Sequence, residues 1–464
     1  MTDFTSLLMA DRGQAGRTIH LVDKSSFEDW AKARPTEDRV LTEANRFDGK
    51  AAGSSVILPR PGGEFEIVAG VEDATVLSPW CLAKLAQTLP EGNYRLAEGS
   101  PGKAALGWLL AQHRFDTYRS KARPAVGARV LLTPEAARAK EAVRLAEATA
   151  LVRDLVDTPA NDLGPVELEQ AIRSVAEAFG GTLRVTIGDE LARDYPMIDA
   201  VGRAASRERA PRLIEVEWGN PAHPRIAIVG KGVCFDSGGL DIKNAGGMRL
   251  MKKDMGGAAH ALALASLIAG ERLPVRLHLL IPAVENAVGG NAFRPGDILR
   301  SRHGLLVEVD NTDAEGRLIL ADALARAAEG EPQLIVDFAT LTGAARIALG
   351  PDLPAMFAND EDLARDIEAA AKEADDPMWR LPLWNGYEDM LKSDVADIVN
   401  SGGGMAGTIT AALFLRRFVP SQIPWVHLDT FAWRPSAKPG RPKGGEALGL
   451  RAAFALLQAR YRPA

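Results

Sequence analysis

Two runs beyond the first third of the chain are apolar at every position, residues 226–229 (Ile-Ala-Ile-Val) and residues 334–336 (Leu-Ile-Val). A strand with one face in water alternates apolar and polar residues, so an uninterrupted apolar strand is covered on both faces. Such strands belong to mostly parallel sheets with helices packed on each side. This feature predicts an α/β fold with a mostly parallel central sheet in the larger, C-terminal part of the chain.

Further strand and helix patterns alternate around these two runs, as a parallel sheet requires. Strands are expected at residues 183–187, 213–218, 225–229, 275–281, 334–338 and 425–428, and helices at 256–270 and 318–329. In such sheets, ligands bind in the loops that follow the carboxyl ends of the strands. Functional residues are therefore expected in those loops.

The first third of the chain predicts a smaller α/β domain. Its strands are expected at residues 18–22, 55–58, 65–71 and 128–132, and its helices at 82–89 and 103–113. Thr133 and Pro134 predict the N-cap and first position of a long connecting helix at 134–157. The predicted organisation is an N-terminal domain at 1–150, the end of the connecting helix and a linker at 151–165, and a larger domain at 166–464.

Composition argues against several classes of protein. The chain carries 55 Lys and Arg against 61 Asp and Glu, and a net charge of −6 gives no electrostatic attraction to nucleic acid or an anionic membrane. Two cysteines, Cys81 and Cys234, exclude a disulfide framework and a thiolate zinc cluster. There is no signal-peptide pattern and no run of about 18 apolar residues. We expect a cytoplasmic protein with no membrane or nucleic-acid partner.

A segment rich in glycine and charge follows the predicted strand at 225–229. Residues 230–243 include Lys231, Asp236 and Lys243, and Asp254 comes shortly after them. The patterns G-x-x-x-x-G-K-[ST] and G-x-G-x-x-G are both absent, which argues against a phosphate loop and a dinucleotide site. Two interpretations remain, a turn whose charges are solvated and a functional site at the end of a strand.

A second acidic segment, residues 311–318 (NTDAEGRL), precedes the predicted helix at 318–329. Asp313 and Glu315 alternate, so their carboxylates would point the same way in an extended segment. Most such pairs are exposed loop acids. If they meet Asp236 and Asp254, however, four carboxylates can share one pocket only around positive charge. Divalent ions such as Mn²⁺, Mg²⁺ or Zn²⁺ would supply that charge and activate a water molecule.

The histidines and Cys234 show no metal-ligand spacing. We expect each histidine to be structural or exposed: His20, His113, His223, His260, His278, His303 and His427. Cys234 has three possible roles, a packed small side chain, a redox-sensitive thiol or a direct metal contact.

Taken together, these motifs resemble those of the leucine aminopeptidase (cytosol aminopeptidase) family. The resemblance rests on V-G-K-G-V-x-F-D-S-G-G from Val229, Lys243, M-K-x-D-M-G-G-A-A from Met251 and N-T-D-A-E-G-R-L from Asn311. Residues 281–286, 291–297, 339–344 and 392–397 extend it, so that it covers roughly residues 155–464. The N-terminal third matches only in size and α/β character.

The resemblance implies an aminopeptidase with two divalent ions per subunit, Zn²⁺ or Mn²⁺. The metal ligands that it implies are Lys231, Asp236, Asp254, Asp313 and Glu315. Asp236 and Glu315 would bridge the two ions, and a bridging hydroxide would attack the first peptide carbonyl of a substrate with a free α-amine. Lys243 would polarise that carbonyl, and Arg317 would hold a bicarbonate ion that acts as general base.

The resemblance also implies a side-chain pocket that includes Met251, Thr340 and Gly343, with further walls from residues near Thr430–Trp433. An adaptable Met251 wall predicts a preference for Leu and Met-like N-terminal residues with broad tolerance, unless Met251 belongs to the core. The chain departs from the family in two places, Cys234, where Thr is common, and residues 244–247, which replace a stretch that commonly holds Pro and Ser. Members form hexamers built from two trimers, so a homohexamer that acts on peptides is expected.

Two other functions stay open at this point. One is a different two-metal hydrolase, such as a dipeptidase or a phosphoesterase. The other is a non-catalytic DNA-binding or regulatory protein built on the same scaffold, against which the net charge of −6 argues.

Overall fold

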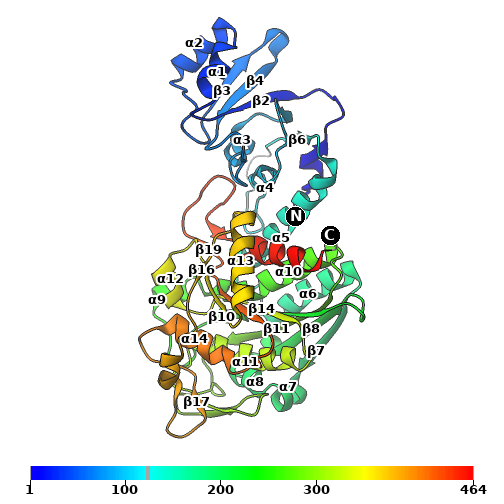
Figure 1. Ribbon diagram of the computed structural model, residues 1–464. Helices are drawn as coiled ribbons and strands as arrows, with labels where there is room; N and C mark the ends of the chain where they lie inside the picture. Colours follow the sequence, from blue (N-terminus) through cyan, green and yellow to red (C-terminus); the bar gives the residue numbers. More distant parts are fainter. Residues whose placement is uncertain (1, 122–125, 463–464) are drawn as a thin grey trace. The chain divides into compact units, whose positions relative to one another are not determined.

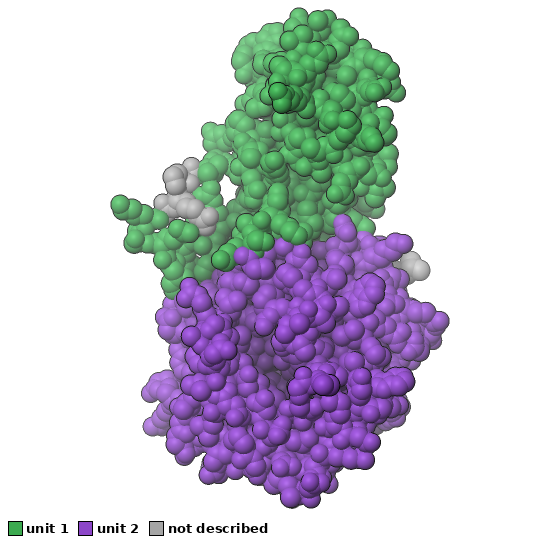
Figure 2. Space-filling model, turned by 90° about the vertical axis from the view of Figure 1, so that its left-hand side faces the viewer, with its two compact units in different colours: residues 1–150, 436–443 green, residues 151–435, 444–464 purple. Residues whose placement is uncertain are grey.

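The computed structural model describes residues 2–121 and 126–462 and divides the chain into two compact units (Figure 1, Figure 2). Unit 1 comprises residues 1–150 and 436–443, and unit 2 comprises residues 151–435 and 444–464. Helix α5 (Ala136–Asp157) contributes residues to both units. No helix of the described residues combines the length and the apolarity needed to cross a membrane.

Unit 1 contains a six-stranded sheet in the order β1-β6-β5-β2-β4-β3, in which only β3 is antiparallel to its neighbour. The strands are β1 (Leu8–Ala10), β2 (Arg17–Val22), β3 (Ser55–Pro59), β4 (Phe65–Gly70), β5 (Gly92–Leu96) and β6 (Arg129–Thr133). The helices are α1 (Phe27–Lys32), α2 (Thr36–Ala44), α3 (Ala83–Thr88) and α4 (Ala104–Leu110). Ile19, Ile67 and Trp108 are fully buried in its core.

Residues 436–443 join unit 1 although they are far from it in sequence. The Arg441 guanidinium lies 4.6 Å from the centroid of the Trp80 ring. Gly440 has a φ of +69°, and a Cβ there would lie 2.9 Å from the Ala83 Cβ. Glycine is therefore required at position 440, both by the left-handed backbone and by the close approach of α3.

Unit 2 contains a nine-stranded sheet in the order β16-β15-β18-β14-β9-β11-β8-β7, with β10 also paired to β11. The central strands β18, β14, β9, β11 and β10 are parallel, whereas β15, β8 and β7 add antiparallel pairings. The strands are β7 (Thr182–Ile187), β8 (Arg212–Trp218), β9 (Arg225–Gly230), β10 (Gly232–Asp236), β11 (Arg276–Asn286), β14 (Leu334–Ala339), β15 (Ala355–Ala358), β16 (Trp379–Arg380) and β18 (Trp425–Asp429). Two smaller sheets are formed by β12 (Ile298–Arg300), β13 (Leu306–Glu308) and β17 (Ile398–Val399), and by β19 (Trp433–Arg434) and β20 (Gly444–Gly445).

Helices cover both faces of this sheet (Figure 1). On one face lie α6 (Pro165–Phe179) and α10 (Gly256–Gly270), and on the other α8 (Pro196–Gly202) and α11 (Glu315–Ala328). Ile228, Val229 and Ile335 are therefore fully buried. The prediction of an α/β fold with a mostly parallel sheet between helices is confirmed. The other helices of unit 2 are α7 (Gly188–Asp194), α9 (Ala245–Met248), α12 (Gly343–Leu349), α13 (Glu361–Ala374), α14 (Gly407–Arg416) and α15 (Leu450–Tyr461).

Two predicted helix starts were wrong. The connecting helix begins at Ala136, because Thr133 is the last residue of β6 and pairs with β1 rather than capping a helix. Helix α11 begins at Glu315 rather than at residue 318. The second difference matters for function, because it places Glu315 and Arg317 in the first turn of a buried helix.

Candidate metal centre

Two of the predicted metal ligands lie at the ends of strands β9 and β10, which both pair with β11, and the others lie in segments that follow strands or begin helices. Lys231 follows the last residue of β9, and Asp236 is the last residue of β10. Asp254 lies in the short 3-10 helix η4 (Met251–Met255), and Glu315 is the first residue of α11. This is the edge of a parallel sheet at which ligands are expected to bind.

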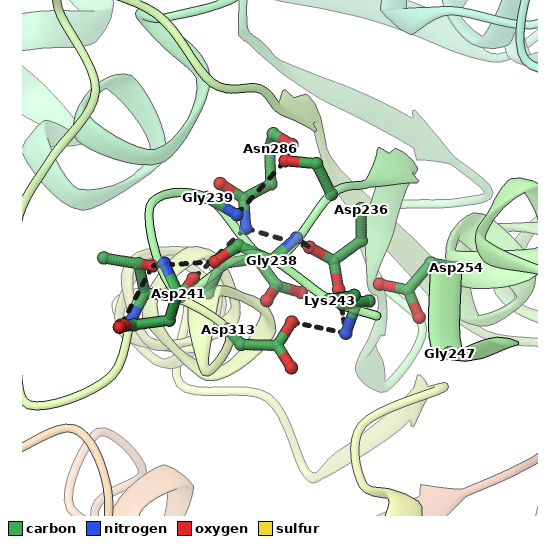
Figure 3. A network of polar contacts seen from close by, with 12 residues as sticks. Asp236, Gly238, Gly239, Asp241, Lys243, Gly247, Asp254, Asn286 and Asp313 are labelled. Carbon is green, nitrogen blue, oxygen red and sulfur yellow. Dashed lines mark hydrogen bonds and ion pairs between the residues drawn. The ribbon is translucent and has the colours of Figure 1, made fainter. Parts of the chain in front are cut away.

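Three carboxylates converge although they are far apart in sequence. Asp236, Asp313 and Glu315 each offer an oxygen, and these oxygens all lie within 4.8 Å of one another. Figure 3 shows Asp236, Asp313 and Asp254 turned toward the Lys243 ammonium group. Of the three clustered carboxylates, Asp236 and Glu315 are buried and the Asp313 side chain is 32% exposed. A group of this size and spacing can hold a metal ion.

The extended conformation predicted for residues 313–315 was wrong. Asp313 lies in a turn, where its amide donates to Asn311 Oδ1 at 2.8 Å, and Glu315 is already helical. The two carboxylates nevertheless converge, because the turn and the first residue of α11 both face Asp236. Asp313 and Glu315 therefore meet because a turn leads into a helix, and not because the segment is extended.

Two lysines neutralise the carboxylates. Lys231 Nζ lies 2.6 Å from Asp254 Oδ2 and 3.0 Å from Glu315 Oε1. Lys243 Nζ lies 2.8 Å from Asp236 Oδ2 and also forms an ion pair with Asp313. Burial opposes the charged form of Lys231, but Asp254 and Glu315 outweigh it and raise the pKa of this lysine above its ordinary value. A bound dication would have to reverse that shift for Lys231 to act as a neutral ligand.

The two lysines do not fully balance the negative charge of the clustered carboxylates. Within the described residues, Glu315 Oε2 is buried and has no hydrogen-bond partner. Burial and the charge of Asp236 raise the pKa of Glu315 to about 8 and that of Asp313 to about 6. Additional positive charge would stabilise the ionised forms of Asp313 and Glu315. Oxygen ligands suit Mn²⁺, Mg²⁺ or Zn²⁺. The residues present therefore fit a divalent-metal site.

Metal-free protein is expected to lose stability as the pH rises from about 5 to about 8. Glu315 keeps its proton in the folded state up to its pKa of about 8, whereas the unfolded chain releases it near the ordinary value of 4.5. The folded state thus binds more protons in this window, and raising the pH favours unfolding. Thermal denaturation after chelator treatment measures the effect, and metal-loaded protein is the control. Melting temperatures of chelated protein that rise across this window would contradict it.

Backbone and amide groups hold the carboxylates in place. Asp236 Oδ1 accepts from the Gly238 amide at 2.8 Å and from Asn286 Nδ2 at 2.9 Å (Figure 3). Asp254 Oδ1 accepts from Thr340 Oγ1 at 2.8 Å. The sequence assigned no role to Asn286, although it ends one of the runs that carried the resemblance. Its position at the end of β11 beside β10 was the available signal.

Gly257 allows the strand ends and α10 to meet at this site. A Cβ on Gly257 would lie 2.2 Å from the Phe338 carbonyl oxygen and 2.8 Å from the Lys231 amide nitrogen. Both neighbours are backbone atoms and cannot move aside. The glycine is therefore required where α10 packs against β14 and Lys231.

Arg317 is buried in the first turn of α11, two residues after Glu315, whose charge acts on it. Its Nη1 donates to the Asn400 carbonyl oxygen at 2.7 Å, and its buried Nε has no partner among the described residues. Burial lowers the pKa of Arg317 to about 10. Of the predicted site residues, Arg317 is the one that does not line the cavity described next.

A cavity of about 310 Å³ opens onto the carboxylate group. All five predicted metal ligands and Lys243 line it, as do Met251, Thr340 and Gly343. Asn244 and Gly247, from the segment that departs from the family pattern, also line it. The residues predicted for chemistry and those predicted for substrate binding thus share one cavity.

The remaining candidates lie outside the cavity lining. The described lining contains no histidine. His260 accepts a hydrogen bond from the Leu448 amide, and His278 and His427 each form an ion pair with a buried acid. Cys234 is 1% exposed, and burial raises the pKa of its thiol. Of the three roles considered for Cys234, this burial agrees with that of a small side chain packed in the core.

Comparison with known proteins agrees with this geometry. The model of the cytosol aminopeptidase family catalytic domain matches residues 150–454, and that of the M17 aminopeptidase N-terminal domain matches residues 18–133. A probable cytosol aminopeptidase of Syntrophotalea carbinolica is 42% identical over 368 residues, which cover 76% of this chain and 73% of the relative.

Two solved structures share the whole fold. The cytosol aminopeptidase of Coxiella burnetii is 45% identical with a TM-score of 0.93, covering 98% of this chain and 100% of that one. The bottromycin maturation enzyme BotP in complex with Mn is 33% identical with a TM-score of 0.86, covering 96% of this chain and 100% of that one. The chain therefore belongs to the cytosol aminopeptidase family of metal-dependent aminopeptidases, which are hydrolases.

Proposed function

We propose that this protein removes the N-terminal residue of peptides with a free α-amine, using two divalent ions, Zn²⁺ or Mn²⁺. The observation that carries the proposal is the convergence of Asp236, Asp313 and Glu315 within 4.8 Å in a cavity that also contains Lys231 and Lys243. The proposed ligands are Lys231, Asp236, Asp254, Asp313 and Glu315. When bound, the ions supply Lewis-acid polarisation and an activated water.

Lys243 and Arg317 have separate proposed roles. Lys243 is 15% exposed and reaches the cavity, so its ammonium group can donate to the scissile carbonyl oxygen and stabilise the negative charge that develops there. Arg317 offers a buried Nε that has no partner among the described residues, and its guanidinium group suits the planar oxygen pair of bicarbonate. That anion would accept the proton of the attacking water.

The side-chain pocket is proposed to lie at Met251, Thr340 and Gly343. Met251 is 9% exposed and lines the cavity with its thioether side chain. A flexible apolar wall suits Leu and Met-like N-terminal residues and tolerates others.

The deciding experiment combines metal analysis with an activity screen over aminoacyl anilides. We expect about two ions per chain at full activity, rapid hydrolysis of leucyl anilide and none of its N-acetylated form, because the free amine is needed for binding. Hydrolysis of phosphoesters without hydrolysis of leucyl anilide would favour a different two-metal hydrolase.

We further propose that the protein acts in the cytosol as a homohexamer built from two trimers. Light scattering at micromolar concentration should then give about six times the chain mass of 49.6 kDa. A mass equal to one chain would contradict the assembly.

A further inference from the structure

The cavity contains two cations beyond those of the carboxylate group. Lys253, next to Asp254 in η4, and Arg346, in α12, both line it together with Phe431. Met251, Thr340 and Gly343 lie in the same lining. The proposed side-chain pocket is therefore not wholly apolar.

The side chain of Lys253 is buried, and its ammonium group forms one long ion pair. Its side chain is 5% exposed, and among the described residues its Nζ donates no hydrogen bond. The nearest carboxylate oxygen is Asp254 Oδ1 at 3.5 Å, which already accepts from Thr340 Oγ1. On the proposed function, Asp254 is committed to a metal ion. A buried charge is poorly compensated by one carboxylate oxygen at 3.5 Å that is already committed elsewhere, so this position favours an acceptor in the cavity.

Arg346 faces the same ring from another element. Its guanidinium carbon lies 4.9 Å from the Phe431 centroid, and Lys253 Nζ lies 5.6 Å from that centroid. Arg346 forms no ion pair with any described residue. The two cations thus flank one aromatic side chain, where the ring face stabilises them only modestly.

The remaining acid of this region, Asp429, forms no ion pair with Lys253 or Arg346 among the described residues. Asp429 accepts from the Leu341 amide at 2.9 Å and from the Thr342 hydroxyl at 2.7 Å. Its two oxygens are therefore occupied by the loop that leads into α12. The side of the cavity around Phe431 therefore leaves the hydrogen-bond donors of Lys253 and Arg346 available to a bound anion.

We propose that the side-chain pocket accepts acidic N-terminal residues, Glu and Asp, with Lys253 and Arg346 binding the side-chain carboxylate. This inference rests on the proposed aminopeptidase function and names a substrate class for it. Phe431 and Met251 line the path of the methylene groups, so Leu and Met remain substrates. A site built to bind a charged group discriminates strongly against an isostere without the charge, because its own polar groups are then left unpaired.

The test compares glutamyl with glutaminyl anilide, which differ in charge but hardly in shape. The wild-type kcat/KM for Glu should exceed that for Gln by about tenfold or more. Lys253→Met and Arg346→Met should each lower the Glu/Gln ratio by about tenfold while two ions per chain are retained. Arg365→Met, which removes an exposed arginine of α13, is the matched control and should leave the ratio unchanged.

Reversing the charge at position 346 should increase activity on a basic substrate, and a misfolded variant would not show such an increase. Arg346 is exposed, so Arg346→Glu should fold, lower the Glu/Gln ratio and raise kcat/KM for lysyl anilide relative to glutamyl anilide. A wild-type Glu/Gln ratio near one, or ratios that the three pocket variants do not change, would overturn this inference while hydrolysis of leucyl anilide still supports the proposed function. If no anilide is hydrolysed, both fail.

Discussion

Replacing Glu315 by Gln is expected to reduce kcat/KM for leucyl anilide by about a thousandfold or more, the loss seen when one member of a catalytic unit is removed. Glu315 is 1% exposed, lies 3.0 Å from Lys231 Nζ and is close to both Asp236 and Asp313. Glutamine keeps the shape but loses the charge, and the ions would lose a shared ligand. Metal analysis should therefore show less than two ions per chain.

The same variant should remain folded. Burial already disfavours the Glu315 carboxylate, whose pKa is raised to about 8, so a neutral amide costs the metal-free protein little. Thermal denaturation after chelator treatment should give E315Q a melting temperature no lower than that of wild type. Asp310→Asn, which removes an exposed acid from the same loop, is the control and should keep activity and metal. Full activity of E315Q with two ions would contradict the proposed centre.

Replacing Lys243 by Met is expected to lower kcat by about 10²–10³-fold, the loss typical when a donor to the developing oxyanion is removed. Lys243 Nζ is 2.8 Å from Asp236 Oδ2 and faces the cavity (Figure 3). In the proposed reaction it acts on the carbonyl and not as a metal ligand. The loss should therefore fall on kcat, with metal content near that of wild type.

Two comparisons separate this role from a general loss of charge. Lys243→Arg keeps a cation at the position and should retain more activity than Lys243→Met. Lys372→Met, an exposed lysine of α13, removes the same charge elsewhere in unit 2 and should leave kcat unchanged. If K243M loses the metal ions together with activity, Lys243 organises the centre and does not act on the carbonyl.

The sequence was sufficient for the fold class because burial is encoded locally. Residues 226–229 and 334–336 can only be strands covered on both faces, and they became β9 and β14 at the centre of the sheet. The helix at 256–270 was predicted to the residue, since its apolar run ends in glycine at both ends. The start of α11 was missed because Asp313 and Glu315 read equally well as a turn or an extended segment.

The sequence by itself determined the α/β architecture and the acidic and basic residues from which a metal centre could be built, because periodicity and residue type are properties of short segments. That Asp236 and Glu315 meet followed from the family resemblance and not from any local pattern, and the structure brings them together. The tertiary structure alone decided that residues 436–443 belong to unit 1 and that Lys253, Arg346 and Phe431 share a cavity. These relations join segments separated by tens to hundreds of residues. They depend on strand order and on which helix covers which face, and no local pattern contains that information.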